Sequence, residues 1–195
     1  IAFTKVLNGH KDDQMYFGYH VVAAYPFGSR DIKSSMDRIP GYTEEIQKMG
    51  VEIIGSIADL LQKVDVVLLE TNDGKLHLEQ AMEVFKAGKR MFIDKPMTAS
   101  LKDAKAIFEA SRQYKIPVFS ASSLRYITGI EKIDKSTVIG ASTFSPAELE
   151  PSHPDLFWYG IHGVETLFTV MGTGCESVVR VSTNDTDVVT GIWED

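Results

Sequence analysis

Short apolar runs alternate with segments of helical periodicity through the first 121 residues of the chain. In the run 66–69, Val, Val, Leu and Leu follow one another without a polar residue, which is typical of a strand covered on both faces. Strands and helices that alternate at this spacing need right-handed crossovers, and such crossovers build a parallel sheet. The sequence therefore predicts an α/β fold with a doubly wound parallel sheet. Its strands are expected near residues 21, 52, 66, 92 and 118.

Capping residues predict where several helices begin. Ser56 and Ser100 each stand directly before a helical pattern, and Asp59 has the spacing of a capping-box acid. Residues 26–42 are rich in Pro, Gly, Ser and Asp, and they predict a long loop. Only a short helix, over residues 43–50, is then expected before the next strand.

The first nine residues have the pattern of the last turns of a helix that ends at Gly9. In a doubly wound fold, the first strand and a Gly-rich phosphate-binding turn come before the first helix. No G-x-G-x-x-G motif occurs in the sequence. We therefore expect that the first strand and this turn are missing, and that the chain is a piece of a longer protein. It does not begin with Met, so a signal peptide cannot be assessed, and a cytoplasmic location is the default expectation.

The pattern changes after Ala121. The elements expected beyond this point are a strand, a helix and two further strands, at residues 138–144, 156–171, 178–181 and 188–193. Strands clustered with one helix are typical of an α+β domain. We expect a Rossmann-like dinucleotide-binding domain over residues 1–121, truncated at its N-terminus. Residues 122–195 would begin a substrate and oligomerisation domain, truncated at its C-terminus.

Composition excludes several classes of partner. The chain has 195 residues, 44% of them hydrophobic, and it contains no apolar run long enough to span a membrane. Its net charge of −7 argues against a nucleic acid or an anionic membrane surface as the main partner. Cys175 is the only cysteine, so no internal disulfide and no thiolate zinc cluster can form. Neither a nucleic acid nor a membrane is therefore expected as a partner.

Lys95 is the first candidate for chemistry. The apolar run 91–93 leads into Asp94, Lys95 and Pro96, and proline cannot donate to a strand ladder, so the strand is expected to stop at Lys95. The carboxyl ends of parallel strands are where open α/β sheets bind ligands. A strand-end lysine can also extend into solvent or pair with a neighbouring acid, and that alternative stays open.

With these residues in view, the chain resembles the Gfo/Idh/MocA family of NAD(P)-dependent dehydrogenases. The resemblance is carried by segments 65–72, 87–89 and 94–96 with His77 between the first two, and then by 123–126 and 160–165. In the family the motif at 94–96 reads Glu-Lys-Pro, so Asp94 is a departure. The resemblance implies an oxidoreductase that transfers a hydride between NAD or NADP and a hydroxyl group of a sugar, a polyol or a related compound. It also suggests a cis peptide before Pro96.

The resemblance implies that Lys95 lies beside the nicotinamide and the reacting hydroxyl. It implies that Thr71 and Asn72 line the nicotinamide end and that Arg125 lies near the domain junction. Tyr25 ends the second strand, where a carboxylate would usually hold the ribose. None of the next three residues supplies that acid, and Ser29 and Arg30 could meet a 2′-phosphate, so NAD and NADP both stay open. The expected cofactor contacts are Tyr25, Ser29, Thr71, Asn72, His77, Asp94, Lys95 and Arg125.

His162 matches the family histidine that completes the acid/base set together with an aspartate four residues earlier. Trp158 occupies the position of that aspartate here. We expect Lys95 and His162 to be catalytic, with Trp158 and Glu165 facing the substrate. A lysine serves as a base when burial lowers its pKa from about 10.4 toward neutrality.

Three alternatives to this interpretation stay open. His162 could be an ordinary core histidine, since it lies in an apolar helix. His153, Asp155, His162 and Glu165 could form a metal site, but they lack a firm ligand spacing, so no metal is expected. Trp158 favours a different class of protein, an inactive relative that binds a nucleotide or a sugar as a sensor or scaffold. We also expect a homo-oligomer formed through the second domain.

Overall fold

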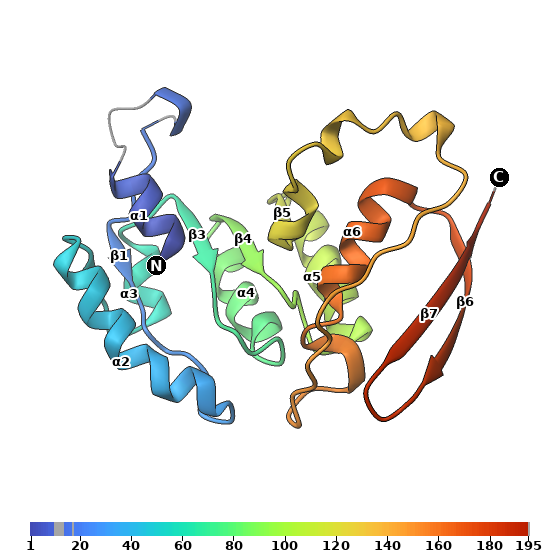
Figure 1. The fold of residues 1–195 in the computed structure, drawn as a ribbon. Helices are drawn as coiled ribbons and strands as arrows, with labels where there is room; N and C mark the ends of the chain where they lie inside the picture. The colour runs from blue at the N-terminus through green and yellow to red at the C-terminus, as the bar shows by residue number, and fades with distance from the viewer. Residues whose placement is uncertain (10–13, 17, 195) are drawn as a thin grey trace. The chain divides into compact units, whose positions relative to one another are not determined.

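A computed structural model describes residues 1–9, 14–16 and 18–194 (Figure 1). The chain divides into two compact units. The first unit contains Ile1–Ala121 and Glu148–Trp158, and the second contains Ser122–Ala147 and Tyr159–Asp195. The segment 148–158 joins the first unit because His153 in it is hydrogen-bonded to the backbone of Gly74.

The first unit is an α/β fold whose strands are parallel, as the sequence predicts. The strands form two sheets and not one continuous sheet. Strand β1 (Ala23–Ala24) pairs with β2 (Glu52–Ile53), and β4 (Arg90–Asp94) lies between β3 (Val66–Leu69) and β5 (Val118–Ala121). The first unit contains the helices α1 (Ala2–Gly9), α2 (Lys33–Lys48), α3 (Ile57–Leu61), α4 (His77–Lys86) and α5 (Leu101–Tyr114), and the 3-10 turns η1 (Gln14–Tyr16) and η5 (Asp155–Phe157).

The break between the two sheets lies between β1 and β3. Both strands line a single cavity of about 950 Å³, together with residues of α1 and α2. The carbonyls of Val22 and Ala24 accept hydrogen bonds from Glu52 and Ile54, so Ala23 directs its backbone groups to the opposite side. In a doubly wound sheet of order 3-2-1-4-5-6, the first strand lies between the second and the fourth. The cavity therefore lies where this strand order places the first strand.

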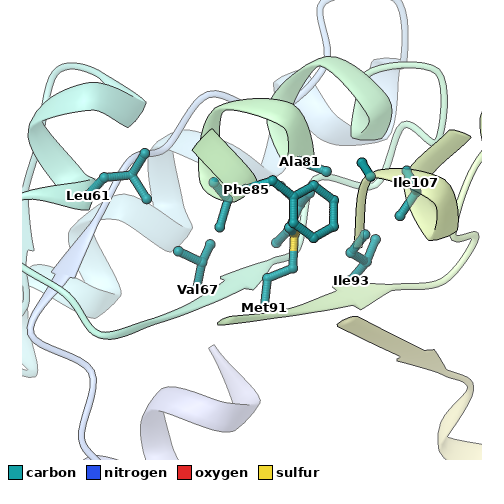
Figure 2. Close-up of a cluster of buried hydrophobic side chains, with 10 residues drawn as sticks. Leu61, Val67, Ala81, Phe85, Met91, Ile93 and Ile107 are labelled. Atoms are coloured by element: carbon teal, nitrogen blue, oxygen red, sulfur yellow. The ribbon is translucent and has the colours of Figure 1, made fainter. Parts of the chain in front are cut away.

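The core of the first unit lies between α4, α5 and the sheet of β3 and β4. Phe85, Ile93 and Ile107 are fully buried there, and Figure 2 shows them packed around Met91 and Ala81. Each fully buried side chain of this size contributes about 1.5–3 kcal/mol of transfer free energy. This buried core therefore fixes the position of β3 and β4, and with it the position of their carboxyl ends.

The predicted loop over residues 26–42 is confirmed for 26–32 and wrong from residue 33 on. Helix α2 begins at Lys33 and runs through Pro40 to Lys48. Ile39 and Ile46 lie seven residues apart on the half-buried face of this helix. Proline in a helix interior costs about 3 kcal/mol, but here the apolar face at helical spacing outweighs that cost. Helix caps are predicted better: the hydroxyl groups of Ser56 and Ser100 accept the expected hydrogen bonds from Asp59 and Asp103.

The second unit contains α6 (Ile161–Met171) and an antiparallel hairpin of β6 (Cys175–Ser182) and β7 (Asp187–Trp193). The predicted strand at 138–144 is wrong, since no ladder forms there and Ile139 and Phe144 are completely exposed. The other elements of this unit are the 3-10 turns η2 (Ser123–Tyr126), η3 (Ile130–Lys132) and η4 (Lys135–Thr137). Within the described residues, no helix has both the length and the apolar character needed to cross a bilayer.

Gly74 is required where the loop after β3 passes the loop after β4. A Cβ atom at this position would lie 2.7 Å from the backbone carbon of Thr98, which is too close for either chain segment to keep its path. We expect Gly74→Ala to destabilise the protein by about 1–3 kcal/mol, measured by urea unfolding. Gly55→Ala is the matched control, because nothing lies within 4 Å of its Cβ position. Equal unfolding midpoints for the two variants would contradict this close contact.

Candidate active site

The carboxyl ends of β3 and β4 bring two charged segments together. Leu69 pairs with Ile93, so the residues that follow, Glu70 and Asp94, are neighbours at the edge of the sheet. Lys95 comes next and is half-buried, and its peptide bond to Pro96 is cis, as the resemblance suggests. This edge is where parallel sheets bind their ligands.

Burial changes the ionisation of this edge. Desolvation lowers the pKa of Lys95, and the charge of Asp94 opposes part of that effect. The protein packed around the carboxyl of Glu70 raises its pKa, although the residue keeps some contact with solvent. The charge of Asp94 also raises the pKa of Glu70. A lysine whose pKa is shifted down in this way has the property that a proton-accepting amine needs.

The cavity beside β3 extends along the same edge. Tyr25, Glu70, Thr71 and Asn72 all line it. Asn72 Oδ1 is buried with no hydrogen-bond partner in the part of the chain that the structure describes, and so is the side-chain oxygen of Gln80, which lines the same cavity. Buried acceptors without donors are costly, so these oxygens are suited to donors on whatever fills the cavity. Oxygens and hydroxyls therefore line the cavity at the carboxyl end of β3, and the carboxyl ends of strands are where open α/β sheets bind ligands.

His77 holds the two loops of this edge together. Its ring is fully buried, with Nδ1 at 2.9 Å from the carbonyl oxygen of Met97 and Nε2 at 2.6 Å from that of Thr71. Each ring nitrogen thus faces an acceptor, and a neutral imidazole can donate to only one of them. The predicted cofactor residue His77 therefore reaches the site through the backbone of Thr71.

Ser29 belongs to a second buried polar group. Its hydroxyl donates to Asp73 Oδ2 at 2.7 Å, so a contact with a phosphate would require this bond to be given up. The backbone N–H of Gly74 donates to His153 Nε2 at 3.2 Å, and Trp158 packs on the His153 ring with centroids 4.9 Å apart. Burial lowers the pKa of His153, which Asp73 partly opposes. Trp158, a predicted substrate residue, thus packs against the histidine that attaches segment 148–158 to the loop after β3.

In the second unit, the predicted residues His162, Glu165 and Arg125 form one network. Glu165 is buried, and its carboxylate accepts hydrogen bonds from the backbone N–H of Ser122 at 2.6 Å and from Arg125 Nε at 2.5 Å. The Ser122 hydroxyl lies 2.7 Å from His162 Nδ1. The ring of Tyr159 contacts His162 edge-on, with centroids 4.8 Å apart. Glu165 therefore orients its neighbours through both of its oxygens.

Sequence reasoning missed Ser122, Asp73 and Gln80. Asp73 and Gly74 continue the turn Thr71-Asn72, so a Gly-containing polar turn after a strand was a usable signal. Ser122 follows β5 directly and has the same residue type as Ser123, and Gln80 lies in the amphipathic helix α4. Among the described residues, no group of three or more His, Cys, Asp or Glu side chains is arranged to hold a metal ion.

A parallel sheet with a break at the switch in strand order, edged by polar residues, defines the class of dinucleotide-binding α/β proteins. The model of the oxidoreductase family with an NAD-binding Rossmann fold, Gfo/Idh/MocA, matches residues 16–122. This match covers more than half of the chain, and the chain belongs to that family. No curated protein matches the sequence significantly.

Solved structures share the fold at low sequence identity. The WlbA dehydrogenase from Chromobacterium violaceum, solved with NADH and UDP-GlcNAcA, is 17% identical with a TM-score of 0.67, covering 98% of this chain and 60% of that one. A dehydrogenase from Bordetella bronchiseptica is 18% identical with a TM-score of 0.65, covering 91% and 51%. The UDP-N-acetylglucosamine 3-dehydrogenase GnnA from Acidithiobacillus ferrooxidans is 18% identical with a TM-score of 0.58, covering 78% and 55%. The chain thus spans only about half to three fifths of these proteins.

Proposed function

We propose that the full-length protein transfers a hydride between NAD or NADP and a hydroxyl group of a sugar, a polyol or a related compound. The observation that carries this proposal is Lys95, a half-buried lysine of lowered pKa at the carboxyl end of β4. The neighbouring strand β3 leads into Thr71 and Asn72, which line the cavity at the break of the sheet. Membership of an NAD-binding oxidoreductase family supports the same assignment.

Lys95 is the proposed base. The neutral amine takes the proton from the substrate hydroxyl, and the electron pair of the broken O–H bond forms the carbonyl while the carbon loses its hydride. Bound NAD or NADP supplies the ring that accepts this hydride. We propose that His162 is a second catalytic residue, and that Thr71 and Asn72 hold the nicotinamide end of the cofactor.

The choice between NAD and NADP depends on residues after β1. Tyr25 and the three residues that follow it supply no carboxylate for the ribose hydroxyls. Arg30 is exposed nearby and offers a cation to a 2′-phosphate, while the Ser29 hydroxyl is engaged by Asp73. Both cofactors therefore belong in the assay.

The substrate proposal takes its support from the solved structures. Two of them bear names or ligands that contain a nucleotide sugar, UDP-GlcNAcA in one and UDP-N-acetylglucosamine in the other. A nucleotide-linked sugar is accordingly the first substrate class to assay. The alternative of an inactive sensor or scaffold gains no support from these comparisons.

We also propose that the protein is a homo-oligomer through its second unit. The β6–β7 hairpin exposes valines on alternate and adjacent positions, among them Val178, Val179 and Val189. An apolar sheet of this kind is typical of surfaces that are covered in a complete protein, by further residues of the same chain or by another chain. The expected cytoplasmic location stays a prediction.

The test is the activity of the full-length gene product on a panel of sugars, polyols and nucleotide sugars with either cofactor. Formation of NADH or NADPH with one substrate class supports the proposal, and inactivity across the panel contradicts it.

We expect the 195-residue chain alone to bind NAD or NADP at least tenfold more weakly than the full-length protein, because the Gly-rich turn and its helix N-terminus hold the pyrophosphate. Calorimetric titration of both proteins measures this difference. Equal affinity would mean that another loop holds the phosphates.

A further inference from the structure

Ser122 lies at the centre of the network in the second unit, and nothing about its residue type or position in the sequence distinguishes it. It is fully buried, and each of its polar groups has a partner. Its backbone N–H donates to Glu165 Oε2, and its hydroxyl oxygen accepts from the backbone N–H of Leu124 at 3.1 Å. The carbonyl oxygen of Ser122 accepts from the backbone N–H of Arg125. The serine is therefore held in place on three sides.

The hydroxyl proton of Ser122 has one acceptor among its described partners, His162 Nδ1 at 2.7 Å. If the bond ran the other way, with Nδ1–H donating to the hydroxyl, this buried proton would lose its acceptor. The arrangement thus favours a neutral ring that accepts at Nδ1. A neutral imidazole that accepts at one nitrogen carries its hydrogen on the other, Nε2.

We propose that Ser122 is a positioning residue that fixes neutral His162 in the tautomer with its proton on Nε2. In that state the ring donates a hydrogen bond from Nε2 and cannot take a proton there. In the proposed reaction, His162 therefore acts as a hydrogen-bond donor and not as a base, which leaves the role of the base to Lys95. This division of roles rests on the proposed hydride transfer, but the tautomer itself does not.

Glu165 holds the backbone of Ser122 in place, and Arg125 in turn holds Glu165. Glu165 holds the Ser122 backbone with one oxygen and Arg125 with the other, and all three groups belong to the second unit. The Tyr159 ring lies edge-on against the His162 ring. The imidazole is therefore constrained by a hydrogen bond at Nδ1 and by an aromatic contact.

The first measurement needs no substitution. Long-range ¹H–¹⁵N correlation spectra of the full-length protein, at a pH where the ring is neutral, identify the protonated nitrogen of His162. A protonated Nε2 with an unprotonated Nδ1 supports the proposal, and the opposite pattern, or an even mixture, overturns it. Because this experiment requires no turnover, it separates the tautomer from the proposed function.

The second measurement uses Ser122→Ala, with Ser122→Thr as the variant that keeps a hydroxyl and Ser123→Ala as the matched control on an exposed neighbour. We expect Ser122→Ala to give a mixture of tautomers and to lower kcat about tenfold with little change in KM, the effect of one oriented hydrogen bond. Ser122→Thr should restore the tautomer and most of kcat, and Ser123→Ala should change neither. A mixed tautomer with unchanged kcat would overturn the catalytic use of the orientation. A fixed tautomer in a protein inactive on every substrate would instead overturn the proposed function.

Discussion

Replacing Lys95 by methionine is expected to lower kcat by about 10²-fold or more in the full-length protein, because the group that accepts the hydroxyl proton is removed. Steady-state kinetics with the best substrate and cofactor measure this loss. The variant should stay folded. Lys95→Arg is the informative companion, since it keeps the charge but cannot give up its proton at any working pH, and it should be as inactive as Lys95→Met. Substantial activity in either variant would contradict Lys95 as the base.

The lowered pKa of Lys95 determines the direction in which the reaction rate and the stability change with pH. Desolvation holds its pKa below the ordinary value, so the rate should rise with pH as the amine loses its proton. Asp94 raises that pKa, and Asp94→Asn should therefore move the rising limb to lower pH. The folded state binds fewer protons than the unfolded chain between the lowered pKa and about 10.4, so wild-type stability rises with pH across that window. Lys95→Met lacks this rise, and its thermal stability at neutral pH should equal or exceed that of the wild type.

Replacing His77 by alanine is expected to destabilise the protein by about 2–5 kcal/mol, because the fully buried ring between the carbonyls of Thr71 and Met97 is lost, and one of these carbonyls loses its donor. Urea unfolding of the variant and the wild type measures the difference. His20→Ala is the control, since His20 is exposed and its removal should change stability by less than about 0.5 kcal/mol. A loss below about 1 kcal/mol for His77→Ala would mean that water replaces the imidazole between the two loops.

The sequence predicted the parallel sheet because that signal is local and redundant. The run 66–69 is continuously apolar, with Val67 and Leu69 buried, and the capping serines Ser56 and Ser100 mark helix starts within a few residues. Helix α2 was missed because Pro40 and Gly41 are residue types that predict a loop. The face that contains Ile39 and Ile46 stabilises the helix only when it packs against the rest of the unit, and the sequence does not show that packing. Residues 138–144 alternate like a strand, but a strand needs a partner, and sequence does not supply one.

The sequence gives a reason to choose a candidate residue where that residue follows a strand end. Lys95 was chosen in this way, because the carboxyl edge of a parallel sheet is a fixed place in the fold. Asn72 was chosen from the family resemblance, and the roles of both residues stay predictions. The position of His77 between two loops was not predicted. Its ring contacts the backbone carbonyls of Met97 and Thr71, and the residue type at a position does not show where its backbone carbonyl points. Ser122 is similar: its importance comes from one hydroxyl proton and one nitrogen brought together from positions 122 and 162.

In the 195-residue chain, the break between β1 and β3 affects how its sheets unfold locally. The two sheets share no ladder hydrogen bond, and the β1–β2 ladder is only two residues long on each strand. Cooperative units of a protein can unfold separately when few buried contacts join them. Amide protons of β1 and β2 should accordingly exchange with solvent through small local openings, whereas those of β4, in the middle of its sheet, should wait for global unfolding. A strand paired with both β1 and β3 would join the two sheets into one. The amide protons of both sheets would then exchange with solvent together.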